Sequence, residues 1–344
     1  MDQPDLDNRT DFVVHPQLLA DRDGEKLAIV VKATFEVQQD GALELAPPDR
    51  ARGVRLADVP WEKEKPESLA YPADLCLRMP GTSVVLAAKA YAPGGRAAPR
   101  IDVRVEVGRL SKSLAVFGRR LWVEGGEGLT EPTPIEELAL RYDLAWGGRD
   151  DRDPQKVVEE ARNPVGMGVT RDAASLTHKA APHIEDPAFP IRTARGTQHP
   201  AGVGPIGRSW EPRRRYAGTY DADWLELKAP LLPDDFDDRY NVCASAGLHA
   251  EAPLVGGESV RLLNLMPGGG ALSFTLPKVS LEIEVGVKGK EPLVFTPHLD
   301  TVFFDLLLVP PGVPAVVELI WRAHTRPPRK MRDARVLVRE RVLS

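Results

Sequence analysis

The sequence predicts a mainly β protein: antiparallel β-sandwich or barrel-like units with a long, ordered, loop-rich central insert and few short helices. Runs of β-branched or alternating residues recur towards both ends of the chain, glycine- and proline-rich turn signals separate them, and the middle has almost no helical or strand period. We therefore expect an N-terminal β unit over residues 1–140, an insert over 141–240, and a C-terminal β unit packed with the first over 241–344.

The first unit is expected to be a series of short antiparallel strands. Residues 1–26 are polar apart from one short apolar run. Residues 27–37 are rich in β-branched side chains, and a turn signal leads from them to a return strand at 43–45. Residues 101–107 alternate strictly, which predicts one buried and one solvated face. Further strands are expected at 83–91, 114–117 and 120–123.

The same pattern returns after the insert. Helices are expected only near 134–140 and 155–161, with a single turn at 223–228, and residues 335–343 fit either a last strand or a short helix. The remaining strands are expected at 258–265, 271–276, 280–287, 293–296, 301–309 and 315–322.

Two segments resemble copies of each other. Each has a Pro-Gly-Gly turn, then an alternating strand, then a Val-Phe strand, at 93–117 and at 267–295. Duplication of one β unit, later split by the insert, explains the likeness. The alternative is that any two antiparallel ribbons share such a pattern.

Composition describes an ordinary globular chain of one large or two smaller domains. Of its 344 residues 42% are hydrophobic and 28% charged, and the net charge of −5 creates no general basic field for nucleic acid. Two cysteines, Cys76 and Cys243, are too few for a disulfide framework, so a cytoplasmic location is expected. No apolar run approaches the ~20 residues that span a bilayer, and no membrane partner is expected.

The insert does not have the composition of a disordered segment. Disordered chains are poor in aromatic residues, and large aromatics within irregular backbone bury area and pin loops. We therefore expect an ordered insert carried by a rigid scaffold, where binding surfaces are often found. Residues 141–239 contain three tryptophans and three tyrosines, which are Tyr142, Trp146, Trp210, Tyr216, Tyr220 and Trp224.

The glycine-rich runs of the insert match no phosphate-binding fingerprint. They lack the Lys-Ser/Thr of a phosphate loop, and no strand–glycine–helix unit surrounds them. Glycines that permit positive φ or close backbone contact are the better interpretation. The residues expected to have this structural role are Gly147, Gly148, Asn163, Pro164, Gly166, Gly168, Gly202 and Gly204.

The sequence predicts no catalytic residue, metal site or cofactor. His178, His183, Glu185 and Asp186 lie close together, but their spacing matches no helical or knuckle pattern for a metal. A Gly-x-Ser-x-Gly elbow is missing. The competing hypothesis is a carbohydrate-active or hydrolytic β-protein that uses tryptophans and a carboxylate pair of the insert. Its candidate acids are Asp221, Asp223, Asp234 and Asp235, although aspartates beside proline and glycine are usually turn residues.

A protein-binding role agrees better with the insert. Trp, Tyr and Arg are the usual anchors of protein–protein interfaces, and the edge strands of a β scaffold offer a second way to hold an extended segment. A purely structural role, pinning the insert to its own scaffold, accounts for at least part of the set. The candidate partner-binding residues are the exposed members of Trp146, Trp210, Arg213, Tyr216, Tyr220, Asp221 and Trp224.

Several motifs, in order over roughly residues 25–325, resemble domain-of-unknown-function family 2169, found beside type VI secretion effectors. The matching segments begin with Lys32-Ala33-Thr34-Phe35, Ala73-Asp74-Leu75 and the Ala-x-Ala-Pro-x-Gly run ending at Gly94. They continue with Trp146-Gly147-Gly148, Asn163 to Gly168, Pro200 to Ile206, Trp210 to Arg213, Ala217 to Asp221 and Leu232 to Phe236, and end with Gly256-Gly257-Glu258, Leu299-Asp300-Thr301 and Trp321-Arg322.

The resemblance implies a non-enzymatic adaptor or chaperone. Such proteins stabilise a toxic effector, commonly one with a PAAR-like tip domain, and help load it onto the secretion spike. The chain departs from the family pattern at Arg78 and Thr82-Ser83, where the family often has Lys followed by Thr-Asp, and at Trp146, where it favours Phe. Because Ser83 stands where the family often has Asp, any role of that Asp in the family is not expected in this chain.

Overall fold

Strand β3 (Gly24–Val37) is a central strand of the largest sheet, and its residues 27–37 are all buried. The computed structural model describes residues 3–38, 40–62, 68–287, 289–307 and 312–341. The predicted mainly β fold is confirmed, with 39% strand and 9% helix. No sheet of the described residues closes into a barrel.

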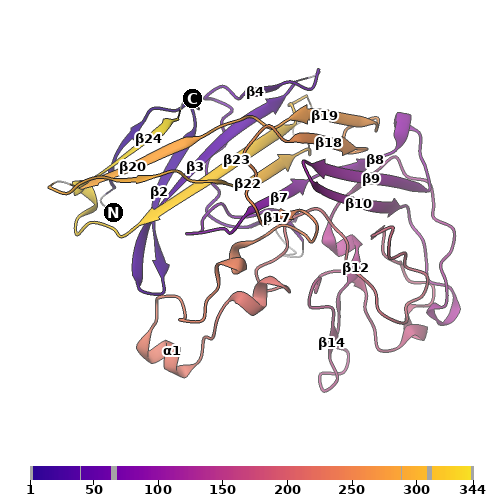
Figure 1. Cartoon of the computed structure of the whole chain (residues 1–344). Helices are drawn as coiled ribbons and strands as arrows, with labels where there is room; N and C mark the ends of the chain where they lie inside the picture. The colour runs from indigo at the N-terminus through magenta and orange to yellow at the C-terminus, as the bar shows by residue number, and fades with distance from the viewer. Residues whose placement is uncertain (1–2, 39, 63–67, 288, 308–311, 342–344) are drawn as a thin grey trace.

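The largest sheet mixes strands from both ends of the chain. Its order is β17-β7-β22-β23-β3-β2, with β4 pairing a further stretch of β3 (Figure 1). The β7–β22 pair is parallel and the other pairs are antiparallel. The two expected β units therefore share one sheet. The strands are β2 (Val13–Asp21), β4 (Leu43–Leu45), β7 (Thr82–Ala87), β17 (His249–Ala250), β22 (Leu299–Asp305) and β23 (Val316–Thr325).

Two smaller sheets complete the scaffold. One has the order β1-β24-β20-β21, with β1 (Asp5–Asn8), β24 (Ala334–Glu340), β20 (Leu281–Val287) and β21 (Leu293–Phe295). The other has the order β16-β10-β9-β18-β19, with β16 (Ile184–Glu185), β10 (Leu110–Phe117), β9 (Arg100–Val107), β18 (Ser259–Leu263) and β19 (Ala271–Thr275).

One hydrophobic core joins the three sheets. It includes Phe303 from the largest sheet, Ile283 and Val336 from the four-stranded sheet, and Val105 and Leu262 from the five-stranded sheet. The alternation expected in residues 101–107 is confirmed, because the even-numbered side chains of β9 lie outside and the odd-numbered ones inside.

The remaining elements are short. Paired strands are β5 (Val59–Pro60) with β6 (Leu69–Tyr71), β8 (Lys89–Tyr91) with β11 (Glu137–Ala139), β12 (Trp146–Gly147) with β15 (Met167–Gly168), and β13 (Arg149–Asp150) with β14 (Val158–Glu159). The helices are α1 (Ala222–Leu227) and the 3₁₀ turns η1 (Pro93–Gly95), η2 (Glu124–Gly126), η3 (Tyr142–Leu144), η4 (Ala173–Leu176), η5 (Arg213–Tyr216), η6 (Asp238–Asn241) and η7 (Met331–Asp333). No helix of the described ranges combines the length and apolar character needed to cross a bilayer.

Several sequence-based expectations were wrong, and strand pairing explains most of them. Residues 134–140 and 155–161 contain the short strands β11 and β14 rather than helices, because each strand has an antiparallel partner that overrides local propensity. Residues 120–123 make isolated bridges only. The strand expected at 83–91 divides after Ala87 between two sheets. Residues 335–340 form a strand, which decides between the strand and the helix expected there. The helical turn expected at 223–228 is confirmed by α1. Of the strand expected at 301–309, residues 308–309 lie outside the described part.

The most important missed element is β2. Its side chains are neither regularly alternating nor strongly apolar, but its whole length pairs with β3 across a tight turn between Asp21 and Gly24. The two suspected copies form hairpins, β9–β10 and β20–β21, in different sheets. Their common ancestry stays a prediction.

The insert extends from one side of the scaffold in two lobes (Figure 1). One lobe contains α1 and lies near the tip of the β2–β3 hairpin. The other contains β12 and β14 and lies on the side of β9 and β10. Strand β16 connects the second lobe to the scaffold by pairing with β10. The insert is therefore ordered and attached to the sheets.

Replacing Phe303 by Ala should lower the free energy of unfolding by about 3–5 kcal/mol, because the side chain is fully buried in β22 and leaves a cavity. Urea denaturation measures the change. Leu56→Ala is the matched control: this side chain is 61% exposed, and its loss should change stability by less than about 0.5 kcal/mol. Equal effects of the two substitutions would contradict the described core.

Candidate functional site

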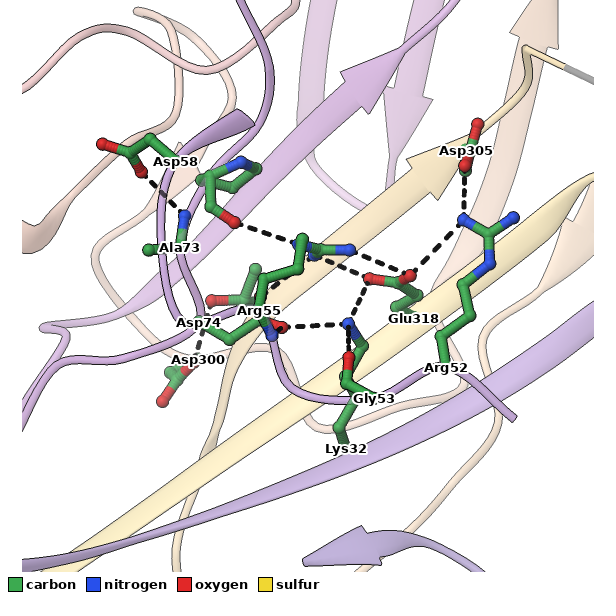
Figure 2. A network of polar contacts seen from close by, with 12 residues as sticks. Lys32, Arg52, Gly53, Arg55, Asp58, Ala73, Asp74, Asp300, Asp305 and Glu318 are labelled. Carbon is green, nitrogen blue, oxygen red and sulfur yellow. Dashed lines mark hydrogen bonds and ion pairs between the residues drawn. The ribbon is translucent and has the colours of Figure 1, made fainter. Parts of the chain in front are cut away.

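A network of buried charges joins β3, β23 and the loops between β4 and β7 (Figure 2). The Lys32 ammonium, fully buried, lies 2.9 Å from Oδ2 of Asp74 and 3.0 Å from Oε2 of Glu318. It also donates a hydrogen bond to the carbonyl of Gly53 at 3.1 Å. Without these oxygens, burial of this charge would be strongly unfavourable.

Two arginines extend the network. Arg55 bridges the same two carboxylates, with Nη2 at 3.0 Å from Asp74 and 2.7 Å from Glu318. Arg52 pairs with Asp305 and lies 3.6 Å from Glu318. Burial alone would raise the pKa of Glu318, but the charges of Lys32 and Arg55 outweigh it and hold the pKa below its usual value. Glu318 is therefore an ion-paired carboxylate.

A β-bulge brings a further ion pair beside this network. The register between β22 and β23 shifts between Leu299 and Thr301, and Asp300 is the extra residue. Its carboxylate is buried and pairs with Arg322. Arg322 also donates to the carbonyl of Asp74 from Nε at 2.9 Å and Nη2 at 2.7 Å. Burial raises the pKa of Asp300.

The network brings together residues from four sequence motifs that lie far apart in the chain, namely Lys32, Asp74, Asp300 and Arg322. Four cations face four carboxylates, so the cluster is neutral, and every one of them is tied to a strand or loop of the scaffold. Its members are Lys32, Arg52, Arg55, Arg322, Asp74, Asp300, Asp305 and Glu318. We assign it a structural role: it fixes loops against the largest sheet.

The lobe of the insert that contains β12 and β14 is held by an asparagine and glycines. Asn163 is fully buried and donates from Nδ2 to the carbonyls of Tyr142 and Trp146, each at 2.9 Å. A Cβ on Gly147 would lie 2.2 Å from the Asn163 carbonyl oxygen, and one on Gly168 would lie 2.7 Å from the Trp146 ring. The Trp146-Gly147-Gly148 motif and the motif from Asn163 to Gly168 therefore pack closely against each other. This close contact agrees with a structural role for these glycines.

Trp210 and Arg213 are also buried inside the insert. The Trp210 ring meets Tyr142 edge to face at 5.3 Å. Arg213 donates to the carbonyl of Ile206 at 2.7 Å and to that of Tyr240 at 2.8 Å. Trp146, Trp210 and Arg213 are each less than 7% exposed, so little of them is available to a partner in this conformation.

The lobe that contains α1 is a clasped arm, which we call the α1 arm and define as residues 217–239. The Thr219 amide and hydroxyl donate to Asp235 at 2.9 and 2.8 Å and close the arm at its base. Gly218, at φ 82°, packs against this contact, where a Cβ would lie 2.9 Å from Asp235. The Ala-Gly-Thr-Tyr-Asp and Leu-Pro-x-Asp-Phe motifs are therefore the two halves of one clasp.

Helix α1 forms the outer end of this arm. Asp221 caps it by accepting a 2.9 Å hydrogen bond from the amide of Trp224. The Trp224 indole donates to the carbonyl of Leu231 at 2.9 Å, and Tyr220 packs on its ring at 4.7 Å. Leu225 and Leu227 are 68% and 79% exposed. Sequence reasoning missed these two leucines, although both follow Trp224 in the expected helical turn.

The candidate binding residues thus divide into two groups. Trp146, Trp210 and Arg213 stabilise the insert from inside, whereas Tyr220 and Asp221 are exposed and Tyr216 and Trp224 are partly exposed. Whether any of them contacts a partner stays a prediction. The accessible part of the set lies on or beside the α1 arm.

The acids proposed for hydrolysis are mostly engaged within the arm. Asp221 caps α1, Asp235 closes the clasp, and Asp234 pairs with Lys228. A hollow of about 590 Å³ next to Trp146 is lined by Glu160 and Arg162. Burial raises the pKa of Glu160, but hydrogen bonds from Arg162 more than offset it and leave the pKa lowered, the opposite of what a general acid needs.

The histidine and acid group of the insert is dispersed. His183 Nδ1 lies 3.1 Å from the carbonyl of Phe117, and Glu185 pairs with Arg120 at 2.9 Å. His199 packs on Phe189 at 4.2 Å. Within the described ranges, no group of three or more His, Cys, Asp or Glu side chains is placed to hold a metal ion.

These features define a β scaffold that carries a motif-rich ordered insert. The chain belongs to the family described as an uncharacterized protein conserved in bacteria (DUF2169), whose family model matches residues 22–322. That range includes the buried charge network and both lobes of the insert. Comparison with curated proteins and with solved structures found no match.

Replacing Lys32 by Met should lower the free energy of unfolding by about 3–5 kcal/mol, because it leaves Asp74 and Glu318 with too little compensating charge. Chemical denaturation measures the effect. The control is Arg326→Ala, which breaks an ion pair with Asp23 on the surface and should cost less than about 1 kcal/mol. A stable Lys32→Met protein would contradict the assigned role.

Replacing Asp235 by Ala should speed deuterium uptake in residues 217–236 by releasing the clasp. The Thr219 amide and hydroxyl hold the pKa of Asp235 below its usual value. The ionised carboxylate therefore supports the clasp above about pH 4, and this support is lost as the pH falls through the lowered pKa.

Exchange corrected for its intrinsic pH dependence should rise on acidification in the wild type and stay flat in Asp235→Ala. Asp223→Ala, a change on the same arm that leaves the clasp intact, is the control. Identical uptake in Asp235→Ala and the wild type would show that another contact holds the arm.

Proposed function

We propose that this protein is a non-enzymatic adaptor or chaperone that binds and stabilises a type VI secretion effector, either a PAAR-like protein or its N-terminal segment, for loading onto the secretion spike. The family resemblance implies the effector. The observation that supports protein binding is the ordered α1 arm, which exposes Tyr220, Leu225 and Leu227 on a clasped base.

Exposed apolar groups on an ordered arm are more informative than the same groups on a loose loop. A surface that is already ordered loses less conformational entropy on binding. Clustered exposed apolar side chains are also unfavourable in water unless a partner covers them. An adaptor acting before secretion would meet its effector in the bacterial cytoplasm.

The mechanism we propose is the covering of an aggregation-prone effector segment. The scaffold supplies a rigid base through the buried charge network, and the insert supplies the contacting surface. Effector release at the spike then requires only that the spike compete for the same segment, since no covalent chemistry is involved.

Co-expression with the effector encoded by the neighbouring gene tests this function. The soluble fraction of the effector should rise several-fold, and the effector should co-purify with the tagged full chain. Phe303→Ala, which weakens the fold, should reduce both. Unchanged effector solubility without co-purification would contradict the proposal. Release of reducing sugar from a polysaccharide that is lost on replacing Asp221, Asp223, Asp234 or Asp235 would support the hydrolytic alternative instead.

A further inference from the structure

We propose that the α1 arm binds a cationic, apolar segment of the partner protein, through a docking surface formed by Tyr220, Asp223, Leu225, Glu226 and Leu227 and the hollow beside Tyr220. This inference rests on the proposed adaptor function and adds the place of contact and the chemistry of the partner. The sequence analysis did not include Leu225, Leu227 or the acids of α1 among the contacting residues.

The apolar part of the docking surface consists of exposed side chains on α1 and a hollow beside it. Tyr220, 52% exposed, packs on Trp224, and Leu225 and Leu227 of α1 are strongly exposed. Tyr220 also lines a hollow of about 190 Å³ between the arm and β2, together with Leu19, Leu77, Leu232 and Phe236. A cavity of roughly 150 Å³ accepts a benzene ring, so the hollow has room for one leucine or phenylalanine side chain.

The arm is attached to the scaffold where this hollow lies. The Leu232 amide donates to the carbonyl of Asp21 at 3.2 Å, at the tip of the β2–β3 hairpin. Lys228 reaches the carbonyl of Arg22 at 3.5 Å. Two walls of the hollow, one from the arm and one from β2, are therefore held at a fixed separation, which favours a preformed site.

The net negative charge of the α1 arm indicates a positively charged partner segment. Residues 219–239 contain seven acidic and two basic side chains, a net charge of −5, which equals the net charge of the whole chain. The two bases are already paired inside the arm, Lys228 with Asp234 and Arg239 with Asp237. Within the described part of the chain, Asp223 and Glu226 of α1 have no cation within ion-pair distance.

A segment that alternates apolar side chains with lysine or arginine complements this surface. Its apolar groups cover Leu225 and Leu227 and fill the hollow, while its cations meet Asp223 and Glu226. The exposed Tyr220 ring offers a cation–π contact as well. The acidic field raises the association rate of such a segment and disfavours an acidic one, including a second copy of the same arm.

The test uses the full chain, the effector from the neighbouring gene, and synthetic peptides of about 15 residues that tile the effector. Peptides that bind should carry net positive charge together with leucine or aromatic residues. Binding of the best labelled peptide, followed by fluorescence anisotropy, should weaken at least ~10-fold in Tyr220→Ser/Leu225→Ser/Leu227→Ser. Thermal unfolding checks that this variant is folded.

A second variant isolates the charges. Asp223→Asn/Glu226→Gln should weaken binding about 3-fold at ~50 mM salt and have little effect at ~300 mM, because salt screens exposed charges. It keeps the proposal testable if the triple variant unfolds. The matched control is Leu293→Ser/Val294→Ser, a pair on β21 that is 53% and 56% exposed and lies outside the arm.

The outcomes separate this inference from the proposed function. Wild-type effector binding that survives both arm variants overturns the inference and leaves the adaptor function standing. Failure of the wild type to bind the effector removes the adaptor function itself. Preferential binding of acidic peptides, equal loss in the β21 control, or sedimentation showing that Leu225 and Leu227 hold two copies of the chain together would each overturn the inference.

Discussion

The buried ammonium of Lys32 is the constraint on which the scaffold depends. A buried charge in that position is stabilised only when Asp74 and Glu318 both pair with it. Strands β3 and β23 and the loop that carries Asp74 therefore have to pack together in one arrangement. Arg55 then satisfies the other oxygens, and the Asp300 bulge holds Arg322 against the carbonyl of Asp74. Apolar packing of the sheets tolerates many alternatives, whereas this network specifies one arrangement of loops.

The insert is also held by polar side chains that satisfy the backbone, one neutral and one ionised. Asn163 in one lobe and Asp235 in the other each satisfy several backbone or hydroxyl donors and acceptors, and adjacent glycines let the backbones approach. The aromatic residues fill the space between. Two small clasps therefore replace the regular hydrogen bonding that a segment of this length lacks, and Leu225 and Leu227 of α1 remain exposed.

Sequence reasoning reached the fold class because alternation in segments such as β9 reports directly on burial. It missed β2, whose pairing with β3 compensates for a weak local pattern. It also expected helices around β11, whose partner β8 lies more than 40 residues earlier, and around β14, which pairs with the nearby β13. Aromatic composition located the insert but could not separate Trp210, which is buried, from Tyr220, which is not. Leu225 and Leu227 escaped notice since isolated leucines carry no sequence signal of exposure.

Interleaving of the two chain ends in one sheet has a consequence for synthesis. Val31 of β3 pairs with Trp321 of β23, 290 positions later. At roughly 5–20 residues per second, the ribosome takes on the order of 15–60 seconds to supply that partner. Throughout this interval β3 has β2 as a neighbour but not β23, and contacts so distant in sequence also form slowly. The apolar edge of nascent β3 that will pair with β23 is therefore open to the cell's general chaperones during synthesis.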